Sequence, residues 1–225
     1  MQEILEKFDP AFQSAARQYI HVTTHDKSHK MAGIQSISTS VLDNPICQYR
    51  RKVPGTVCEK CYADHLCRYR KSLQNCLSRN LSILSGHLMD QQECLRVPID
   101  TAYARIESFG DVANLTHARN YIRIINANPQ TQWGIWSKNL EIWMEAFDIE
   151  GKPENCSFVL SSTFLNAPAQ LPQFKRAYVD HVFTVWTKDR YDFAGTPTEC
   201  AGLSCRTCLK CYRRDTPFEI NEKLR

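Results

Sequence analysis

The chain has 225 residues, a formal net charge of +4 at pH 7, 43% hydrophobic residues and 23% charged residues. This length fits one large domain or two small ones, and the composition is that of a globular protein that can bury one sizeable core. No run of residues approaches the ~20 apolar residues that a membrane-spanning helix needs, and so mild a charge does not by itself indicate a nucleic-acid partner.

Eleven residues are cysteines, an unusually high and odd number. The N-terminal stretch lacks the apolar segment of a secretory leader, so we expect a cytoplasmic location and no disulfide framework. Clustered cysteines in a reducing compartment are typically metal ligands or catalytic thiols.

The first 30 residues predict an amphipathic helix over residues 1–20, interrupted at Pro10, followed by a linker. His25 and His29 are four residues apart and could bind zinc from one helix face, but the glutamate of the metalloprotease motif does not follow His25. A basic surface segment is therefore the favoured interpretation of this stretch.

Residues 31–95 predict a strand, a loop and a long helix, with cysteines around the loop. Residues 34–41 alternate and predict the strand, and leucines at spacings of three and four predict one helix over residues 62–89. The cysteines form a C-x10-C-x2-C set of possible metal ligands, Cys47, Cys58 and Cys61, with Cys67 as a possible fourth.

Residues 96–190 predict βα repeats. Four short apolar stretches recur at roughly 25-residue intervals, at residues 104–109, 132–137, 157–162 and 181–186, and helical patterns separate the first three. Strand, helix and strand at this interval are typical of a parallel sheet. With the strand at 34–41 there are at least five strands. That is too few for a complete eight-stranded barrel, so we expect a single α/β domain over residues 1–225 with a partial or irregular parallel βα barrel, or an open parallel sheet.

Polar residues follow each predicted strand, and functional groups of parallel α/β folds gather at such strand ends. The predicted catalytic residues are Glu107, Asp111 and Lys138, and the residues predicted to bind a cofactor or ligand are Ser161, Ser162, Thr184 and Lys188. Together they could hold a small polar ligand with amino and carboxylate groups. The alternative is structural: Asp111 and Asn139 could simply cap the helices that follow them.

The C-terminal segment, residues 191–225, contains the strongest motif, C-x4-C-x2-C-x2-C, formed by Cys200, Cys205, Cys208 and Cys211. The first three cysteines match the spacing of plant-type ferredoxin ligands. Iron–sulfur is favoured over zinc, because zinc ribbons usually separate two C-x2-C pairs by 15 to 20 residues. The sequence leaves open whether there are one or two clusters, and whether both cysteine groups share one.

These residues resemble the phage "gene product 88" family. The resemblance covers most of the chain from about residue 30 and is carried by MAGI at residues 31–34, SISTS at 36–40, NPIC at 44–47, CEKCYA at 58–63, Asn80, Arg105, Gly110, Asp111, WSK at 136–138 and the terminal cysteine run. It would place the protein in the cytoplasm of the phage host.

More distantly, the chain is similar to phage and bacterial proteins with the partial barrel of radical S-adenosylmethionine enzymes and spore photoproduct lyase. That similarity implies a 4Fe–4S cluster with one open iron on Cys47, Cys58 and Cys61, and an auxiliary cluster on the four C-terminal cysteines. It also implies S-adenosylmethionine as a possible cofactor. The usual C-x3-C-x2-C motif and the Gly-Gly-Glu strand end are absent, so radical chemistry is a hypothesis.

Three functions remain open at this point. The first is an iron–sulfur enzyme acting on a small molecule, a nucleotide or a nucleic acid. The second is a zinc-stabilised nucleic-acid-binding protein without catalysis, suggested by the basic residues Arg50, Arg51, Lys52, Arg68, Arg70, Lys71, Arg213 and Arg214 near both cysteine groups. The third is a thiol–disulfide or electron carrier.

Overall fold

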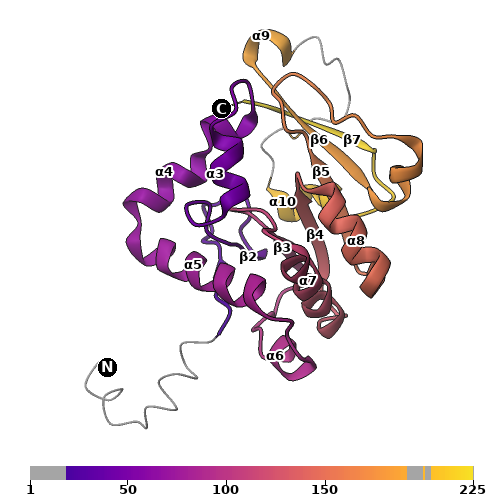
Figure 1. Cartoon of the computed structure of the whole chain (residues 1–225). Helices are drawn as coiled ribbons and strands as arrows, with labels where there is room; N and C mark the ends of the chain where they lie inside the picture. The colour runs from indigo at the N-terminus through magenta and orange to yellow at the C-terminus, as the bar shows by residue number, and fades with distance from the viewer. Residues whose placement is uncertain (1–18, 192–199, 201–203, 225) are drawn as a thin grey trace.

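The computed structural model of the protein describes residues 19–191, 200 and 204–224 (Figure 1). The helix predicted over residues 1–20 falls almost wholly outside these residues. The described part is mixed α/β, as predicted from the alternation of apolar strands and helices.

A single open sheet of seven strands organises the described residues, and its strands follow one another in chain order. Strands β2 to β7 run parallel, while β1 pairs antiparallel with β2 at one edge. The strands are β1 (Val22–Thr24), β2 (Gln35–Ile37), β3 (Tyr103–Ile106), β4 (Gln132–Ser137), β5 (Cys156–Ser161), β6 (His181–Trp186) and β7 (Glu219–Lys223). The predicted open, mainly parallel sheet is confirmed and it is not a closed barrel; β1 and β7 were not predicted.

Helices connect the parallel strands. They are α3 (Pro45–Arg51), η1 (Val57–Lys60), α4 (Tyr62–Tyr69), α5 (Lys71–Gly86), α6 (Gln91–Leu95), α7 (Leu115–Ala127), α8 (Leu140–Glu150), η2 (Gln173–Tyr178), α9 (Lys188–Tyr191), α10 (Cys205–Cys208) and η4 (Lys210–Tyr212). Since connections between parallel strands are nearly always right-handed, neighbouring strands in chain order keep their connecting helices on one face. Helices α5, α7 and α8 accordingly pack side by side over the sheet (Figure 1). The segment between β6 and β7 is the exception, because η4 packs on the other face. None of the described helices is long and apolar enough to cross a membrane.

Strand β4 shows how the two faces of the sheet differ. Trp133 and Ile135 point toward the helices and belong to the main hydrophobic core. Gly134 and Trp136 point to the opposite face, where Tyr212 of η4 packs. A Cβ atom on Gly134 would lie 3.0 Å from the Tyr212 ring, so this close approach requires glycine. The C-terminal cysteine segment therefore covers the face of the sheet that the helices leave open.

The single helix predicted over residues 62–89 is wrong, because the chain breaks into α4 and α5 at Arg70. Arg70 has φ −101° and ψ 83°, outside the helical region. Its N–H still donates to Leu66 O, and its carbonyl accepts from Gln74 N. The last turn of α4 and the first turn of α5 therefore both keep a backbone hydrogen bond at the break. No glycine or proline marks the break, and the apolar spacing continues across it, so the sequence pattern does not reveal it.

Two predicted strands extend too far. The strand predicted over 34–41 ends at Ile37, because the chain beyond it bonds to α5 instead of to a neighbouring strand: Asn80 Nδ2 donates to Ser38 O, and Ser40 N donates to Leu77 O. The strand predicted over 104–109 ends at Ile106, since Glu107 takes a positive φ of 59° that a strand cannot accommodate.

Candidate metal centre at the strand ends

The three cysteines of the first group come from different elements. Cys47 lies in α3, Cys58 in η1, and Cys61 precedes α4. Burial raises the pKa of Cys47 above its usual range, and negative charge on Asp111, Glu107, Cys58 and Cys61 raises this pKa further. The three thiols thus share one neighbourhood, next to the residues that follow β3.

Helix α3 is fixed to the strand ends by its own polar residues. Asn44 accepts a hydrogen bond from Ile46 N, which caps the helix, and donates to Asp111 O over 2.6 Å. Arg50 at the other end of the helix forms an ion pair with Asp111 at 3.1 Å and donates to Asn139 Oδ1 at 2.6 Å. These contacts hold Cys47 over the carboxyl ends of β3 and β4.

Asp111 is the centre of this attachment. Its carboxylate also accepts hydrogen bonds from the Ser137 hydroxyl and from the backbone of Val112 and Lys138. The alternative that Asp111 caps the following helix is wrong, because Asn114 caps α7. Asn139 occupies the cap position of α8, but its side chain makes no capping bond and contacts Arg50 instead.

The loop that carries Cys58 is held against the residues after β5. Val57 N donates to Thr163 O at 2.9 Å, and Leu165 N donates to Gly55 O at 3.1 Å. Burial raises the pKa of Cys58, while the positive charges of Lys138 and Arg50 lower it. Lys138 in turn donates to Ser161 Oγ at 3.1 Å. The structure therefore brings Cys58, Lys138 and Ser161 together at the carboxyl ends of the parallel strands, which we call the rim.

Glu107 lies below this rim and is buried. It accepts hydrogen bonds from the Thr39 hydroxyl at 2.7 Å, from Thr39 N at 3.1 Å and from the Tyr121 hydroxyl at 2.8 Å. Burial raises the pKa of Glu107 to about 8. Gly110, with a φ of +91°, closes over it, since a Cβ atom there would lie 2.7 Å from Glu107 Oε2. Glu107 thus ties the residues after β2 to α7, and the hydrogen-bond partners of its carboxylate are Thr39 and Tyr121.

The other predicted ligand-binding residues do not join Ser161. Ser162 and Thr184 are buried and lie 3.3 Å apart, hydroxyl to hydroxyl. Lys188 is exposed at the start of α9. The rim that the structure assembles is therefore smaller than the predicted one and centres on β3, β4 and β5.

The second cysteine group lies on the face of the sheet opposite the helices. Cys200 N donates to Asn221 O of β7, and Cys205 N donates to Lys30 O. Cys205 and Cys208 are the first and last residues of α10, and Leu209, with a positive φ of 51°, turns the chain into η4 with Cys211. These bonds join the C-terminal segment to residues near the start of the chain.

Two cations that were not among the predicted site residues accompany this group. Lys30 Nζ donates to Cys200 Sγ at 3.2 Å and pairs with Glu222 at 3.1 Å. Arg105 lies over the Trp136 ring, 3.8 Å from its centre. Burial raises the pKa of Cys211 to about 12, and the charge of Arg105 opposes this rise. Arg105 could have been recognised from strand alternation, because it shares the open face of β3; Lys30 gives no such signal.

The four C-terminal cysteines also lie within range of one another's charge. Cys200, Cys205 and Cys208 each raise the pKa of Cys211, after the larger effect of burial. Burial likewise raises the pKa of Cys205, and the charges of Lys30 and Arg105 lower it. All eleven cysteines of the chain are free thiols.

The described cysteines of the two groups are not arranged as metal ligands. Across residues 19–191, 200 and 204–224, no three or more His, Cys, Asp or Glu side chains are arranged so that they could hold a metal ion. The chemistry of the two sets of cysteines nevertheless fits a soft metal ion or an iron–sulfur cluster, because both prefer thiolate ligands. Binding would require the thiols to lose their protons and turn toward a common centre.

The remaining predicted ligands have other surroundings. Cys67 is buried with Val41, Ala63 and Leu77, and burial raises its pKa to about 11, which suits a small core residue. His25 and His29 lie in a turn region, not a helix, with rings stacked at 4.4 Å.

Tyr62 lies between the two cysteine groups. The residue as a whole is 62% exposed, while burial around its hydroxyl raises the pKa of that group, on which the charges of Arg105, Cys61, Glu222 and Lys30 also act. Its hydroxyl donates to Ser108 O at 2.7 Å. Cys61 belongs to the first group, and Lys30 and Glu222 belong to the surroundings of the second. Charges from the surroundings of both groups therefore act on Tyr62.

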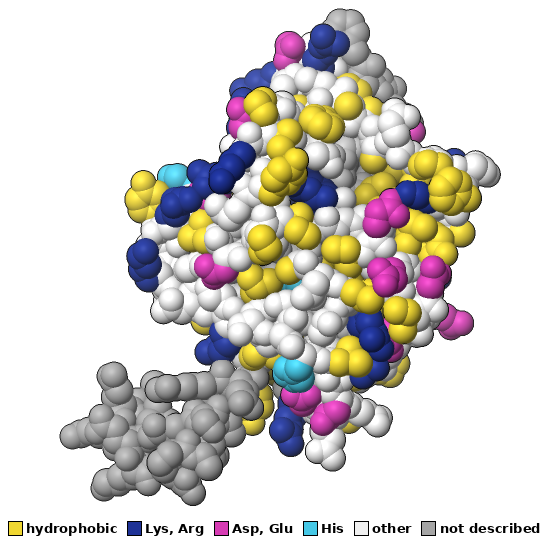
Figure 2. All heavy atoms as spheres, viewed as in Figure 1, with side chains coloured by type: hydrophobic (Ala, Val, Ile, Leu, Met, Phe, Trp, Pro, Cys, Tyr) yellow, Lys and Arg dark blue, Asp and Glu magenta, His cyan; other side chains and the backbone are white. Residues whose placement is uncertain are grey.

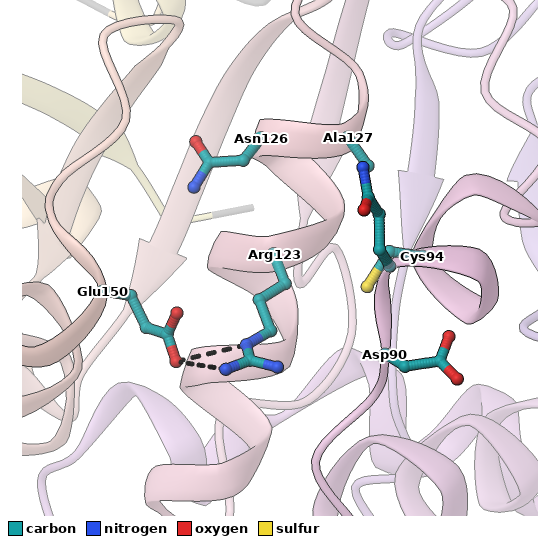
Figure 3. A pocket seen from close by; sticks show the side chains of 7 residues that line it. Asp90, Cys94, Arg123, Asn126, Ala127 and Glu150 are labelled. Atoms are coloured by element: carbon teal, nitrogen blue, oxygen red, sulfur yellow. Dashed lines mark hydrogen bonds and ion pairs between the residues drawn. The ribbon is translucent and has the colours of Figure 1, made fainter.

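A separate pocket of roughly 310 Å³ lies on the helix side, between α6, α7 and α8, away from both cysteine groups (Figure 3). Arg123 and Glu150 form an ion pair in its wall at 3.1 Å, and Arg119 joins the same carboxylate at 2.7 Å. Cys94 and Asp90 line the other side (Figure 3). Arg123 and Glu150 already pair with each other and Asp90 caps α6, so this pocket is a weaker candidate than the strand ends.

Comparison with known proteins supports the family resemblance. The family model described as Gene product 88 matches residues 22–218, which contain every strand except the last one and both cysteine groups. No curated protein and no solved structure matches the chain. The chain therefore belongs to the Gene product 88 family of phage proteins.

Proposed function

We propose that this protein binds iron–sulfur clusters and acts as an enzyme on a ligand held at the strand ends. The observation that carries the proposal is the gathering of Cys200, Cys205, Cys208 and Cys211 on the open face of the sheet, beside Lys30 and Arg105. Its place would be the cytoplasm of the phage host.

The electrostatics support a negatively charged cluster at the C-terminal group. A 4Fe–4S cluster with four thiolates carries net negative charge, and hydrogen bonds to its sulfurs tune its potential. Lys30 already donates to Cys200 Sγ at 3.2 Å, and the charge of Arg105 acts on Cys205 and Cys211. These cations would offset the cluster charge in a partly buried setting, where screening by salt is weak.

The first group supports a second, open cluster. Three thiolates, on Cys47, Cys58 and Cys61, would leave one iron without a protein ligand, and such an iron can bind a substrate or S-adenosylmethionine. Lys138 and Ser161 lie beside Cys58 and could bind a carboxylate and an amino group of that ligand.

Zinc is the competing metal, since the same thiolates would bind it. A zinc protein without catalysis would not need Lys138 and Ser161 as a ligand-binding pair at the strand ends. The contact of Lys138 with Ser161 beside Cys58 therefore supports the cluster enzyme over the zinc alternative.

The test is the iron, sulfide and zinc content of protein purified without oxygen, together with its absorption near ~400 nm. We expect iron and sulfide at one or two clusters per chain. A Cys205→Ser, Cys208→Ser double variant should lose one cluster, and a Cys47→Ser, Cys58→Ser variant should lose another. Cys76→Ser, outside both groups, is the matched control and should keep both. Stoichiometric zinc without iron would support the zinc alternative, and protein without either metal would refute both.

A further inference from the structure

Helix α4 carries a row of exposed rings. Tyr62, His65 and Tyr69 are spaced at i, i+3 and i+7, which places them on one face of the helix. Tyr62 is 62% exposed and Tyr69 75% exposed, and His65 is exposed as well. The rings of His65 and Tyr69 lie 4.6 Å apart. We call these three residues the α4 ring row.

Exposing aromatic rings to water costs free energy unless another molecule binds to them. Large aromatic side chains bury most of their surface in ordinary cores, and exposed aromatic groups concentrate at binding surfaces. Within α4 the apolar positions Ala63 and Cys67 are buried, so the helix has a core face of its own and the ring row is on its other side. Tyr62 packs on Phe109 and bonds to Ser108 O, whereas the rings of His65 and Tyr69 contact each other, so these last two rings do not serve the packing of α4.

Positive charge surrounds the ring row. Residues 45–75 contain seven Lys or Arg and two Asp or Glu, so this stretch carries +5 while the whole chain carries +4. Asp64 is buried and pairs with Arg51 and Arg68. Within the described part of the chain, no carboxylate pairs with the other exposed cations, Lys52, Lys60, Arg70 and Lys71. Figure 2 shows Lys and Arg side chains gathered over α3 and α4, with a histidine and hydrophobic side chains beside them.

We propose that this surface binds single-stranded nucleic acid, DNA or RNA. The cations would contact phosphates, and bases would stack on the α4 ring row, which is the combination that single-strand-binding proteins use. An acidic peptide would be attracted by the charge but would have no use for the rings. In a duplex the bases already stack on one another, so their faces are not available to the rings.

The geometry suits a short stretch of a strand and points it toward the metal centre. Seven residues of helix span ~10 Å, about the length of three stacked nucleotides. The row begins at Tyr62, which follows Cys61 and bonds to Ser108 O beside the end of β3. A strand lying along the row would reach the strand ends. Binding of single-stranded nucleic acid at this surface does not depend on the proposed function. Only the further interpretation, that the bound nucleotide is the substrate of the enzyme, rests on that function.

The first test measures the stacking. Fluorescein-labelled oligomers of about twelve thymidylates or uridylates, and a duplex of the same length, are titrated with full-length protein at about 50 mM salt while anisotropy is followed. We expect a single strand to bind more tightly than the duplex, and comparing the two oligomers distinguishes DNA from RNA. Tyr69→Ala should weaken single-strand binding about tenfold, and Tyr69→Phe should retain it. Phe174→Ala, which removes a 72% exposed ring of η2, is the control and should change nothing.

The second test measures the charge. For the Arg70→Gln, Lys71→Gln double variant, the slope of log affinity against log salt should fall in magnitude by about 1.4, since each lost phosphate contact on a single strand removes about 0.7. Arg96→Gln, at the exposed end of α6, should leave the slope unchanged. Circular dichroism checks that every variant is folded.

Several outcomes would overturn the proposal: no binding of single strands at low salt, equal binding by wild type and Tyr69→Ala, preference for the duplex, or equally tight binding of poly-glutamate, which would indicate an acidic protein partner.

The Cys205→Ser, Cys208→Ser variant separates this surface from the proposed function. If it loses its cluster and still binds single strands, the surface is independent of the cluster. Wild type without any cluster that still shows the Tyr69 effect would refute the proposed function alone.

Discussion

Lys30 Nζ donates a hydrogen bond to Cys200 Sγ over 3.2 Å, although 170 residues separate them in the chain. The same ammonium pairs with Glu222 of β7. One cation thus joins the turn before β2, the first residue of the C-terminal cysteine motif and the last strand. Through this contact a residue near the start of the described chain acts on a thiol near its end.

Lys30→Gln should change the C-terminal cluster without preventing its formation. Removing a positive charge beside a negative cluster favours the oxidised form, which carries less negative charge, so the reduction potential should become more negative. For a partly exposed charge we expect a shift on the order of 50 mV, measured by anaerobic redox titration. Lys27→Gln removes a neighbouring exposed lysine and is the control. Equal potentials in wild type and Lys30→Gln would show that this lysine does not face the cluster.

Gly134→Ala should loosen the C-terminal segment from the sheet. The new methyl group would lie 3.0 Å from the Tyr212 ring and 2.6 Å from the Trp136 ring, so one of them must move. We expect a loss of ~1–3 kcal/mol in the free energy of unfolding, measured by urea denaturation, and a lower yield of the C-terminal cluster. Gly86→Ala is the matched control. Nothing lies within 4 Å of its Cβ position, and in a helix this change should be neutral or stabilising by ~0.5–1 kcal/mol.

The sequence was sufficient for the central strands because burial imposes an unambiguous pattern there. Strands β4 and β6 begin and end where the apolar runs at 132–137 and 181–186 do. The edge strands gave no comparable signal. β1 has three residues, and β7 has a single isoleucine among one asparagine and three charged residues, so only pairing with a neighbour makes either one a strand.

For the candidate site, spacing identified the thiols but not their surroundings. The grouping of Cys205, Cys208 and Cys211 follows from two-residue gaps within one turn of chain. The positions of Lys30 and Glu107 depend on contacts between distant segments, which the local pattern does not encode. Glu107 has the sequence position of a strand-end catalytic residue, yet Thr39 and Tyr121 enclose it.

Asp111→Asn should destabilise the protein and loosen Cys47. Arg50 and Asp111 are 18% and 7% exposed at their side chains, so removing the carboxylate charge leaves a largely desolvated guanidinium without its partner. We expect a loss of ~3 kcal/mol in the free energy of unfolding and reduced metal occupancy at the first cysteine group. Asp215→Asn removes the carboxylate of an exposed ion pair with Arg213 and should cost less than ~0.5 kcal/mol. Similar losses for both variants would contradict a docking role for Asp111.

His117 should make stability depend on pH in a defined window. The ring is buried in α7, and burial lowers its pKa from 6.5 to about 3. Between these two values the unfolded chain binds a proton that the folded chain does not, so stability rises with pH from about 3 to 6.5, is complete above 6.5, and is lost as pH falls. Burial raises the pKa of Glu107 from 4.5 to about 8, so between these pH values the folded chain binds a proton that the unfolded chain has lost. The contribution of Glu107 to stability therefore falls as pH rises through this range.

His117→Asn isolates the histidine from this opposing effect. Asparagine can keep the acceptor that takes a hydrogen bond from Ala113 N, but it has no titrating group. We therefore expect the stability difference between wild type and variant, measured by urea denaturation at a series of pH values, to grow in favour of the variant as pH falls from 6.5 toward 3. His65→Asn, at an exposed position, should leave the pH profile of wild type unchanged. Parallel profiles for wild type and His117→Asn would mean that the buried ring takes up its proton without unfolding. Among the residues that the structure describes, Glu107 has its carboxylate 3.7 Å from this ring and would then stabilise the proton, so the two groups would titrate as a pair.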